Sequence, residues 1–323
     1  MFKKIKTNTG MILVDKENTL ECLYVGDYGR ENNIKADFLG LTKEIDTVVN
    51  TPVDLDEKMV VTISTQKGCP MNCMFCDCPF VPFKGNCSLA DLTYQVRSAI
   101  KESGCSYTER FNLHFARMGE PSFNQNVLEF AKILPLVLPS GFKSGVIHPV
   151  VSTMLPKSNK NLIPFIHDWC DIKNITYKGE AGIQFSINTL DDEARNKMFD
   201  NKSLGLQEIS DLAKSLPMPV GRKYTLNFAV TSSCDLDPVK MNALFDKKKF
   251  IVKITPIHET RRAVDNSYEI IKDFDVYSKF ERPLVEAGWD VIVFVPSIEE
   301  DADRITCGNA LLREVNEVKL CQQ

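Results

Sequence analysis

The chain has 323 residues, of which 43% are hydrophobic and 25% are charged. These proportions are those of a folded globular protein, and they exclude a disordered or fibrous chain. Its 39 Lys and Arg and 43 Asp and Glu give a net charge of −4, which argues against a protein whose affinity depends on broad contact with phosphates. The length fits one large α/β barrel or two small domains.

The sequence shows no sign of membrane insertion or secretion. No apolar run reaches the roughly 20 residues that a membrane-spanning helix needs. The basic N-terminus leads into residues 7–10, which are polar, so it is not typical of a signal peptide. We therefore expect a cytoplasmic protein with no membrane partner. In that reducing compartment the 11 cysteines indicate metal or redox roles rather than structural disulfides.

Two kinds of pattern follow each other along the chain. Short β-like pieces at 11–14, 20–25 and 47–53 predict a small β segment at the N-terminus. After it, β-rich apolar runs at 59–65, 111–118, 145–153, 182–188, 223–231, 250–257 and 291–295 predict strands. Helical periodicity lies between them at 89–103, 126–138, 158–169, 191–216 (interrupted near Gly205), 238–247 and 267–287.

This alternation predicts the fold class. Strands that alternate with helices form right-handed βαβ units around a parallel sheet. We predict an α/β protein with a partial (β/α)6 TIM-like barrel, in which residues 1–57 are the accessory β segment, residues 58–300 the barrel and residues 301–323 a tail. In such a barrel the chemistry is expected at the C-terminal ends of the strands.

Three cysteines follow the first predicted barrel strand, in the segment Cys69-Pro-Met-Asn-Cys73-Met-Phe-Cys76. Three thiolates on one loop can bind three irons of a [4Fe–4S] cluster and leave the fourth iron open. An open iron can chelate S-adenosylmethionine, whose reductive cleavage yields a 5′-deoxyadenosyl radical. Phe75 either stacks near the adenine or packs under the loop. The alternative is a zinc site that Cys78 or Cys87 completes.

Two further motifs carry a resemblance to a known enzyme family. The segment Ser64-Thr65-Gln66-Lys67-Gly68-Cys69 resembles the Ser-Ser-Gln-x-Gly-Cys of the RlmN/Cfr methyltransferases, radical SAM enzymes that methylate an adenine in RNA. The segment Met118-Gly119-Glu120-Pro121, with Asn124, resembles their Met-Gly-Glu-Pro-x-x-Asn. The resemblance covers about residues 45–315 in scattered motifs. It implies a radical SAM barrel that holds a [4Fe–4S] cluster on Cys69, Cys73 and Cys76.

The resemblance also implies which residues bind S-adenosylmethionine. Gly119 allows close approach of the backbone, and Glu120 is expected to bind the ammonium of the methionine moiety. The other expected contacts are polar residues that end successive strands, together with the loop aromatic: Ser152, Ser186, Asn188, His258 and Phe75. Taken singly, each polar residue fits strand-end capping equally well. Asn188 replaces a family histidine, which keeps hydrogen bonding but not titration.

Two implied catalytic residues lie outside these motifs. Cys307-Gly308-Asn309 resembles the family's Cys-Gly-Gln, which implies that Cys307 carries the methyl group. Asp46 stands roughly where the family has a glutamate that accepts a proton. Thr62 occupies the position of the family's second, resolving cysteine, and a hydroxyl cannot form a disulfide. Candidates to replace that thiol are Cys78, Cys87, Cys105 and Cys321.

The sequence therefore predicts a radical SAM methyltransferase that acts on an adenine carbon of RNA, either rRNA or tRNA. A flavodoxin or ferredoxin would supply its electrons. The second hypothesis is a radical SAM enzyme that abstracts hydrogen from a nucleotide-like small molecule without methyl transfer, which Thr62 and the acidic balance favour. The third is a zinc-binding RNA module without enzymatic activity.

Overall fold

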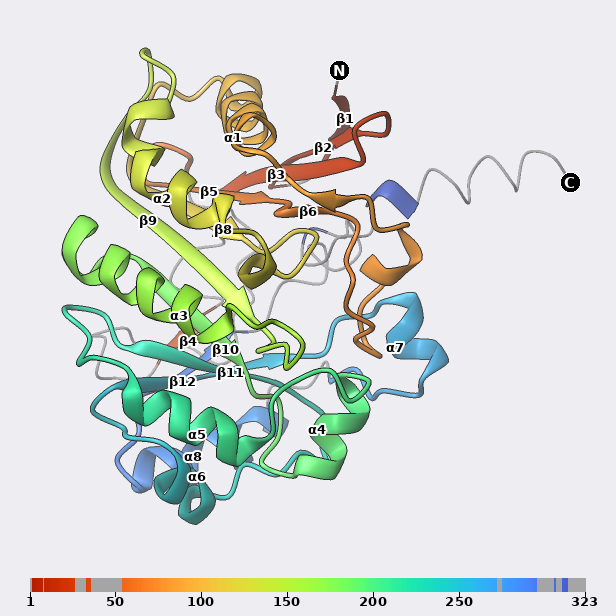
Figure 1. The fold of residues 1–323 in the computed structure, drawn as a ribbon, viewed down its shortest axis with the longest axis vertical. Coiled ribbons are helices and arrows are strands. Elements are labelled where there is room, and N and C mark those ends of the chain that lie inside the picture. The colour runs from red at the N-terminus through yellow and green to blue at the C-terminus, as the bar shows by residue number, and fades with distance from the viewer. Residues whose placement is uncertain are drawn as a thin grey trace, which may run out of the picture.

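The computed structural model describes residues 2–7, 9–26, 33–35, 54–271, 275–294, 305 and 310–312, and their centre is one strongly curved sheet (Figure 1). The sheet has 11 strands in the order β1-β2-β3-β5-β8-β9-β10-β11-β12-β13-β4. Its parallel part consists of β5 (Lys58–Ile63), β8 (Tyr107–Phe115), β9 (Lys143–Thr153), β10 (Gly182–Ser186), β11 (Tyr224–Val230), β12 (Phe250–Pro256) and β13 (Val291–Phe294).

Antiparallel strands extend the sheet on both sides. On one side these are β1 (Lys3–Lys6), β2 (Gly10–Asp15) and β3 (Leu20–Gly26), and on the other β4 (Asn33–Lys35). β3 pairs antiparallel with β5, and β4 pairs antiparallel with β13. The predicted N-terminal β segment is therefore continuous with the barrel sheet, and the domain boundaries at residues 57 and 300 stay predictions.

Helices cover the outside of the curved sheet (Figure 1). They are α1 (Leu89–Ser103), α2 (Asn126–Val137), α3 (Leu162–Asp171), α4 (Asp192–Met198), α5 (Leu206–Ser215), α6 (Pro238–Leu244), α7 (Arg261–Asp265) and α8 (Asp275–Glu286). A strand followed by helix occurs six times before β13 ends the series. The predicted partial (β/α)6 barrel is confirmed.

The two faces of the parallel sheet differ in polarity. In β5, Met59, Val61 and Ile63 are fully buried against the outer helices, whereas Lys58 and Thr62 point into the barrel. Side chains alternate between the two faces of a strand, so every parallel strand contributes to both environments. The outer face makes the hydrophobic core, and the inner face surrounds a cavity.

Short elements position the loops at the C-terminal ends of the strands. They are the two-stranded ribbon β6 (Gln66–Lys67) and β7 (Gly85–Asn86), the 3₁₀ turns η2 (Cys78–Phe80) and η3 (Pro121–Phe123), and the π-helical turn η4 (Ile172–Thr176). α1 begins with a capping box between Ser88 and Asp91 and ends at Gly104, whose φ of 67° suits glycine.

Some predicted element bounds differ from the structure. The helix expected at 158–169 begins at Leu162, because the Asn159 side chain turns away to the carbonyl of Ser122 and accepts the N–H of Asn161. Within the helix predicted at 267–287, the structure describes the shorter helix α8 (Asp275–Glu286). The piece predicted at 47–53 lies outside the described residues. In the part of the chain that the structure describes, no helix has the length and hydrophobicity needed to cross a bilayer.

Candidate functional site

The loop with the three cysteines is held by two helices that come much later in the chain. Thr260, the N-cap of α7, donates its hydroxyl to the carbonyl of Phe75 at 2.8 Å. The Asp77 carboxylate accepts the backbone N–H groups of Arg261 and Arg262 at 3.0 and 2.8 Å. These bonds satisfy donors that a helix N-terminus otherwise leaves open. They fix the loop relative to the end of β12.

A second set of bonds ties the loop to the end of α4. The N–H of Met74 donates to the carbonyl of Met198 at 2.9 Å. The side chain of Asn72 donates to Asp200 at 2.9 Å and accepts from the Arg262 guanidinium at 2.6 Å. The loop is therefore bonded to the ends of several barrel elements.

The electrostatics of the loop match a set of metal-binding thiolates. Burial raises the pKa of Cys69 to about 12 and that of Cys73 well above its usual value, and the nearby thiolate of Cys76 adds to both shifts. A hydrogen bond with the thiol of Cys78 lowers the pKa of Cys76. Buried thiolates that repel one another need a bound cation. A positively charged metal group at the loop would offset the cost of burying these thiolates.

The spacing of the three thiols suits a cluster, because a cubane binds each thiolate through a different iron. A zinc site would need a fourth ligand beside them. Cys87, one suggested fourth zinc ligand, is fully buried in the hydrophobic core. The triad of Cys69, Cys73 and Cys76 therefore fits a [4Fe–4S] cluster.

The turn after β8 touches this loop. Gly119 has a φ of 96°, and a Cβ there would lie 2.5 Å from Cβ of Gln66, so only glycine fits. Its N–H donates to the sulfur of Cys69, which opposes the rise in pKa that burial causes. The close approach that the sequence predicted at Gly119 is thus an approach to Gln66 and Cys69.

Glu120 is buried, with 4% of its surface exposed, and its carboxylate already has partners. It accepts the N–H groups of Ser122 at 3.1 Å and of Met154 at 3.0 Å. Burial nevertheless raises the pKa of this carboxyl group. Glu120 thereby joins the turn after β8 to the end of β9. Among the described residues that line the two cavities below, neither Gly119 nor Glu120 appears.

A cavity of about 280 Å³, here called the rim cavity, lies beside the cysteine loop. It brings together residues from the loop and from the ends of four strands, β8, β10, β11 and β12. Four of its lining residues are predicted contacts of S-adenosylmethionine: Phe75, Ser186, Asn188 and His258. Asn188 adopts a positive φ of 67°, and its side-chain oxygen accepts the N–H of Ala229 at 3.2 Å. The ring of Phe75 packs edge-on against Phe199 and Tyr268 and also lines the cavity.

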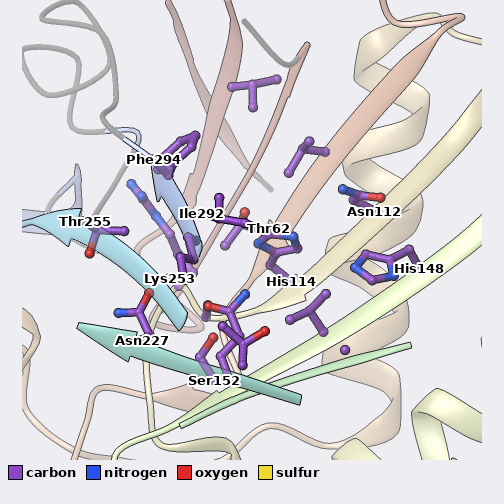
Figure 2. Close-up of a pocket in the computed structure, with 18 of the residues that line it drawn as sticks. Thr62, Asn112, His114, His148, Ser152, Asn227, Lys253, Thr255, Ile292 and Phe294 are labelled. Carbon is purple, nitrogen blue, oxygen red and sulfur yellow. The ribbon is translucent and has the colours of Figure 1, made fainter. Parts of the chain in front are cut away.

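A second cavity of about 490 Å³, here called the lumen, fills the inside of the barrel (Figure 2). Ser152, the remaining predicted contact, lines the lumen rather than the rim cavity, and so does Thr62. The two cavities share five residues and so adjoin: Ala116, Arg117, Asn227, Thr255 and His258.

Sequence reasoning missed most of the polar residues of the lumen. The labelled side chains of Asn112, His114, His148 and Lys253 come from three strands and lie around the same cavity in Figure 2. The signal was present, because polar residues recur at every second position on several strands of a parallel sheet. A sheet buried on both faces has continuous apolar runs instead.

The C-terminal segment is tied to the barrel on both sides of Cys307. Arg117 and Glu21 form an ion pair whose side chains are 1% and 0% exposed. Arg117 also donates to the carbonyl of Ile305 at 2.7 Å, and Glu21 accepts the N–H of Leu311 at 2.8 Å. Cys307 itself and Asp46 lie outside the described residues.

The remaining cysteines differ in their access to the site. Among the described cysteines outside the triad, only Cys78 lines either cavity. Its thiol donates to the carbonyl of Arg117 at 3.7 Å. Cys105 donates to the carbonyl of Tyr107 at the opposite end of the barrel, and Cys321 lies outside the described residues. Of the four cysteines suggested for the resolving role, Cys78 is the described one that lines a cavity, and the role itself stays a prediction.

The relatives found by comparison with known proteins carry the same name. No protein-family model matches the chain. The probable dual-specificity RNA methyltransferase RlmN of Mycolicibacterium vanbaalenii is 27% identical over 243 residues, which are 72% of this chain and 63% of that protein. The same-named protein of Mycolicibacterium gilvum is 30% identical over 192 residues, which are 58% and 49% of the two chains.

The fold has a solved counterpart. A radical SAM methyltransferase from Sphaerobacter thermophilus superposes with a TM-score of 0.62 at 16% identity, over 92% of this chain and 77% of that one. The chain spans between about half and just under two thirds of the length of the two curated relatives. The chain is thus similar in sequence to RNA methyltransferases named RlmN, and its fold is that of the solved radical SAM methyltransferase.

Proposed function

We propose that this chain is a radical SAM methyltransferase that methylates an adenine carbon of RNA. The observation that carries the proposal is the position of the three-cysteine loop. Cys76 and the neighbouring Phe75 line a cavity at the strand ends, and that cavity adjoins the lumen. Bound there, a [4Fe–4S] cluster and S-adenosylmethionine supply a 5′-deoxyadenosyl radical. Relatives named as RNA methyltransferases support the substrate class.

The roles of the chain's own residues follow from their positions. Cys69, Cys73 and Cys76 would hold the cluster. Four residues of the rim cavity would contact S-adenosylmethionine: Phe75, Ser186, Asn188 and His258. Ser152 would contact it from the lumen. Gly119 and Glu120 would act as positioning residues, since they fix the turn that donates an N–H to Cys69.

Cys307 would carry the methyl group, and Asp46 would accept the proton that leaves the adenine. Support for Cys307 comes from its neighbours, since Ile305 lines the lumen and both Ile305 and Leu311 are bonded to the Arg117–Glu21 pair. A flavodoxin or ferredoxin as reductant and a cytoplasmic location belong to the same proposal.

One experiment tests the proposal. The full chain is reconstituted anaerobically with iron and sulfide and mixed with dithionite and S-adenosylmethionine. Iron content, 5′-deoxyadenosine and the mass of the peptide around residue 307 are then measured. We expect about four irons per chain, deoxyadenosine, and a methyl-sized mass gain on Cys307. The Cys307→Ala variant should bind as much iron as the unsubstituted chain but show no methyl-sized mass gain at residue 307. The Cys76→Ser variant should bind less iron.

Different failures have different meanings. Cys105→Ala, which changes a cysteine far from the site, serves as the control and should match the unsubstituted chain. Stoichiometric zinc without iron would reject the radical chemistry altogether. Iron and deoxyadenosine with an unmodified Cys307 would reject methyl transfer through this residue and favour hydrogen abstraction on a small molecule.

A further inference from the structure

The lumen is unusually cationic for the inside of a protein. Its described lining residues include five Lys or Arg and no Asp or Glu. Two of the five have carboxylate partners at the edges of the cavity, since Arg117 pairs with Glu21 and Lys223 pairs with Asp290 at 2.6 Å. Lys253, which projects from the middle of a strand, is not matched in this way among the described residues.

Lys253 is the central charge of the lumen. It extends from the middle of β12, and its ammonium lies 5.0 Å from the centre of the Phe294 ring. Among the described residues, no carboxylate pairs with it. Burial lowers the pKa of Lys253 to about 8. An ammonium without a counter-ion is costly inside a protein, and an anionic ligand would offset that cost.

Two histidines with lowered pKa values, His114 and His148, line the same cavity as this charge. Burial, together with the charges of Lys253 and Lys58, lowers the pKa of His114 to about 3, and all three side chains line the lumen. His148 is held well below its usual pKa by burial and then by Arg222 and other neighbours. A neutral imidazole has one N–H to donate. His148 donates its N–H from Nδ1 to the carbonyl of Glu180, so His114 is the histidine that can donate to a ligand.

Asn112 gives an independent sign of a missing ligand. Its side chain is 8% exposed and lines the lumen, and its amide oxygen is buried without a hydrogen-bond partner in the described structure. The residue pairs with His148 across the strands and lies on the same face of β8 as His114. A buried polar atom of this kind calls for a partner. Here that partner must bring a donor, such as a hydroxyl group.

We propose that the lumen binds the ribose-phosphate part of a nucleotide, with the phosphate beside Lys253 and His114 and a sugar hydroxyl donating to Asn112. The volume of about 490 Å³ is in the range of small-molecule sites. Because the lumen adjoins the rim cavity, such a ligand reaches toward the cysteine loop with its other end. The inference rests on the proposed function, whose substrate class it narrows.

Binding measurements on the reconstituted full chain, without S-adenosylmethionine, test this site. Anaerobic calorimetry compares 5′-AMP with adenosine and uses inorganic phosphate as a competitor. AMP should bind about tenfold or more tightly than adenosine, because hydrogen bonds to a charged group are the stronger ones. Lys253→Met should remove this preference, while Lys214→Met, which deletes an exposed lysine on α5, should leave it intact.

A second variant guards against a folding artefact. Asn112→Asp has nearly the same shape and places a carboxylate where the ligand would lie. It should weaken the binding of AMP by about tenfold or more and leave the binding of adenosine less affected. Equal affinities for AMP and adenosine in the unsubstituted chain would overturn the proposal. So would an unchanged AMP affinity in Lys253→Met.

The same binding experiment distinguishes a free nucleotide from a nucleotide that belongs to a nucleic acid. A short 5′-phosphorylated oligoribonucleotide that displaces AMP identifies the ligand as the end or backbone of a nucleic acid. Failure to displace AMP identifies a free nucleotide. The lumen site and the proposed function can be rejected independently. If AMP binds no more tightly than adenosine while deoxyadenosine still forms, only the lumen site is rejected. Phosphate binding without deoxyadenosine or methylated Cys307 rejects only the proposed function.

Discussion

Gly119 lies where the turn after β8 passes closest to Gln66. In Gly119→Ala the new methyl group would meet Gln66, and the residue would keep a positive φ that alanine disfavours. We expect the free energy of unfolding to fall by about 2–4 kcal/mol. The iron content after reconstitution should fall too, since the N–H that donates to Cys69 moves.

Chemical denaturation and iron analysis check this prediction. Gly141→Ala is the matched control, because no atom lies within 4 Å of the added methyl group. It should change the free energy of unfolding by less than about 0.5 kcal/mol. Equal stability of the two variants would show that the turn after β8 can shift without loss.

Lys253 makes stability depend on pH. Its pKa is 10.5 in an unfolded chain and about 8 in the folded one. Between these values the unfolded chain holds a proton that the folded chain has released, so stability rises with pH through this window. Below about pH 8 the cost of burying the charge is fully present. Lys58 also faces this charge, and its own pKa is lowered to about 8, mainly by burial.

We therefore expect Lys253→Met to be more stable than the unsubstituted chain at pH 7. The difference should shrink as the pH rises from about 8 to 10.5. Urea denaturation at several pH values measures it, with Lys214→Met as the control for the loss of a surface charge. A difference that stays constant across this window would show that Lys253 keeps its ordinary pKa.

At the scale of elements, all seven parallel strands were predictable, because each is a compact apolar run next to a helical period. β1 was missed since three of its four residues are lysines, and α7 was missed since its five residues are too few for a period. The cysteine loop was recognisable because its ligands are adjacent in sequence. The lumen left only a partial signal, the polar residues at every second position of several strands, because the register of separate strands decides which of them meet.

Asp77 connects two elements that are far apart in the sequence. In Asp77→Ala, the N–H groups of Arg261 and Arg262 lose their acceptor at the start of α7. We expect a loss of about 1–2 kcal/mol in the free energy of unfolding and weaker retention of iron, because α7 holds the cysteine loop. Thermal unfolding of the reconstituted protein and its iron content measure both effects.

Asp77→Asn keeps an oxygen acceptor and is the control for this experiment. It should lose less stability than Asp77→Ala, because asparagine caps helices about as well as aspartate. If the alanine variant retained all its iron on heating, α7 would not be what orders the loop.

At the scale of the whole molecule, Arg117 joins the first and last parts of the chain. Its guanidinium bonds to Glu21 in β3 and to Ile305 near the C-terminus. Arg117→Met leaves a buried carboxylate without its partner, which should cost about 3–5 kcal/mol. It should also release the segment around Cys307, so methylation of this cysteine should fall.

Denaturation and peptide mass analysis check the two parts of this prediction. Lys132→Met removes an exposed pair with Glu129, whose side chains are 47% and 59% exposed, and should change stability by less than about 0.5 kcal/mol. Full methylation of Cys307 in Arg117→Met would show that the ion pair does not position the tail.

The connection between β3 and β4 limits how far the barrel can open. β3 is the third strand from one edge of the sheet, and β4 is the opposite edge, yet only seven residue steps (33 − 26) separate Gly26 from Asn33. A fully extended chain of that length spans about 25 Å at most. Gly26 at the end of β3 and Asn33 at the start of β4 can therefore move apart by no more than this length, whatever fills the lumen.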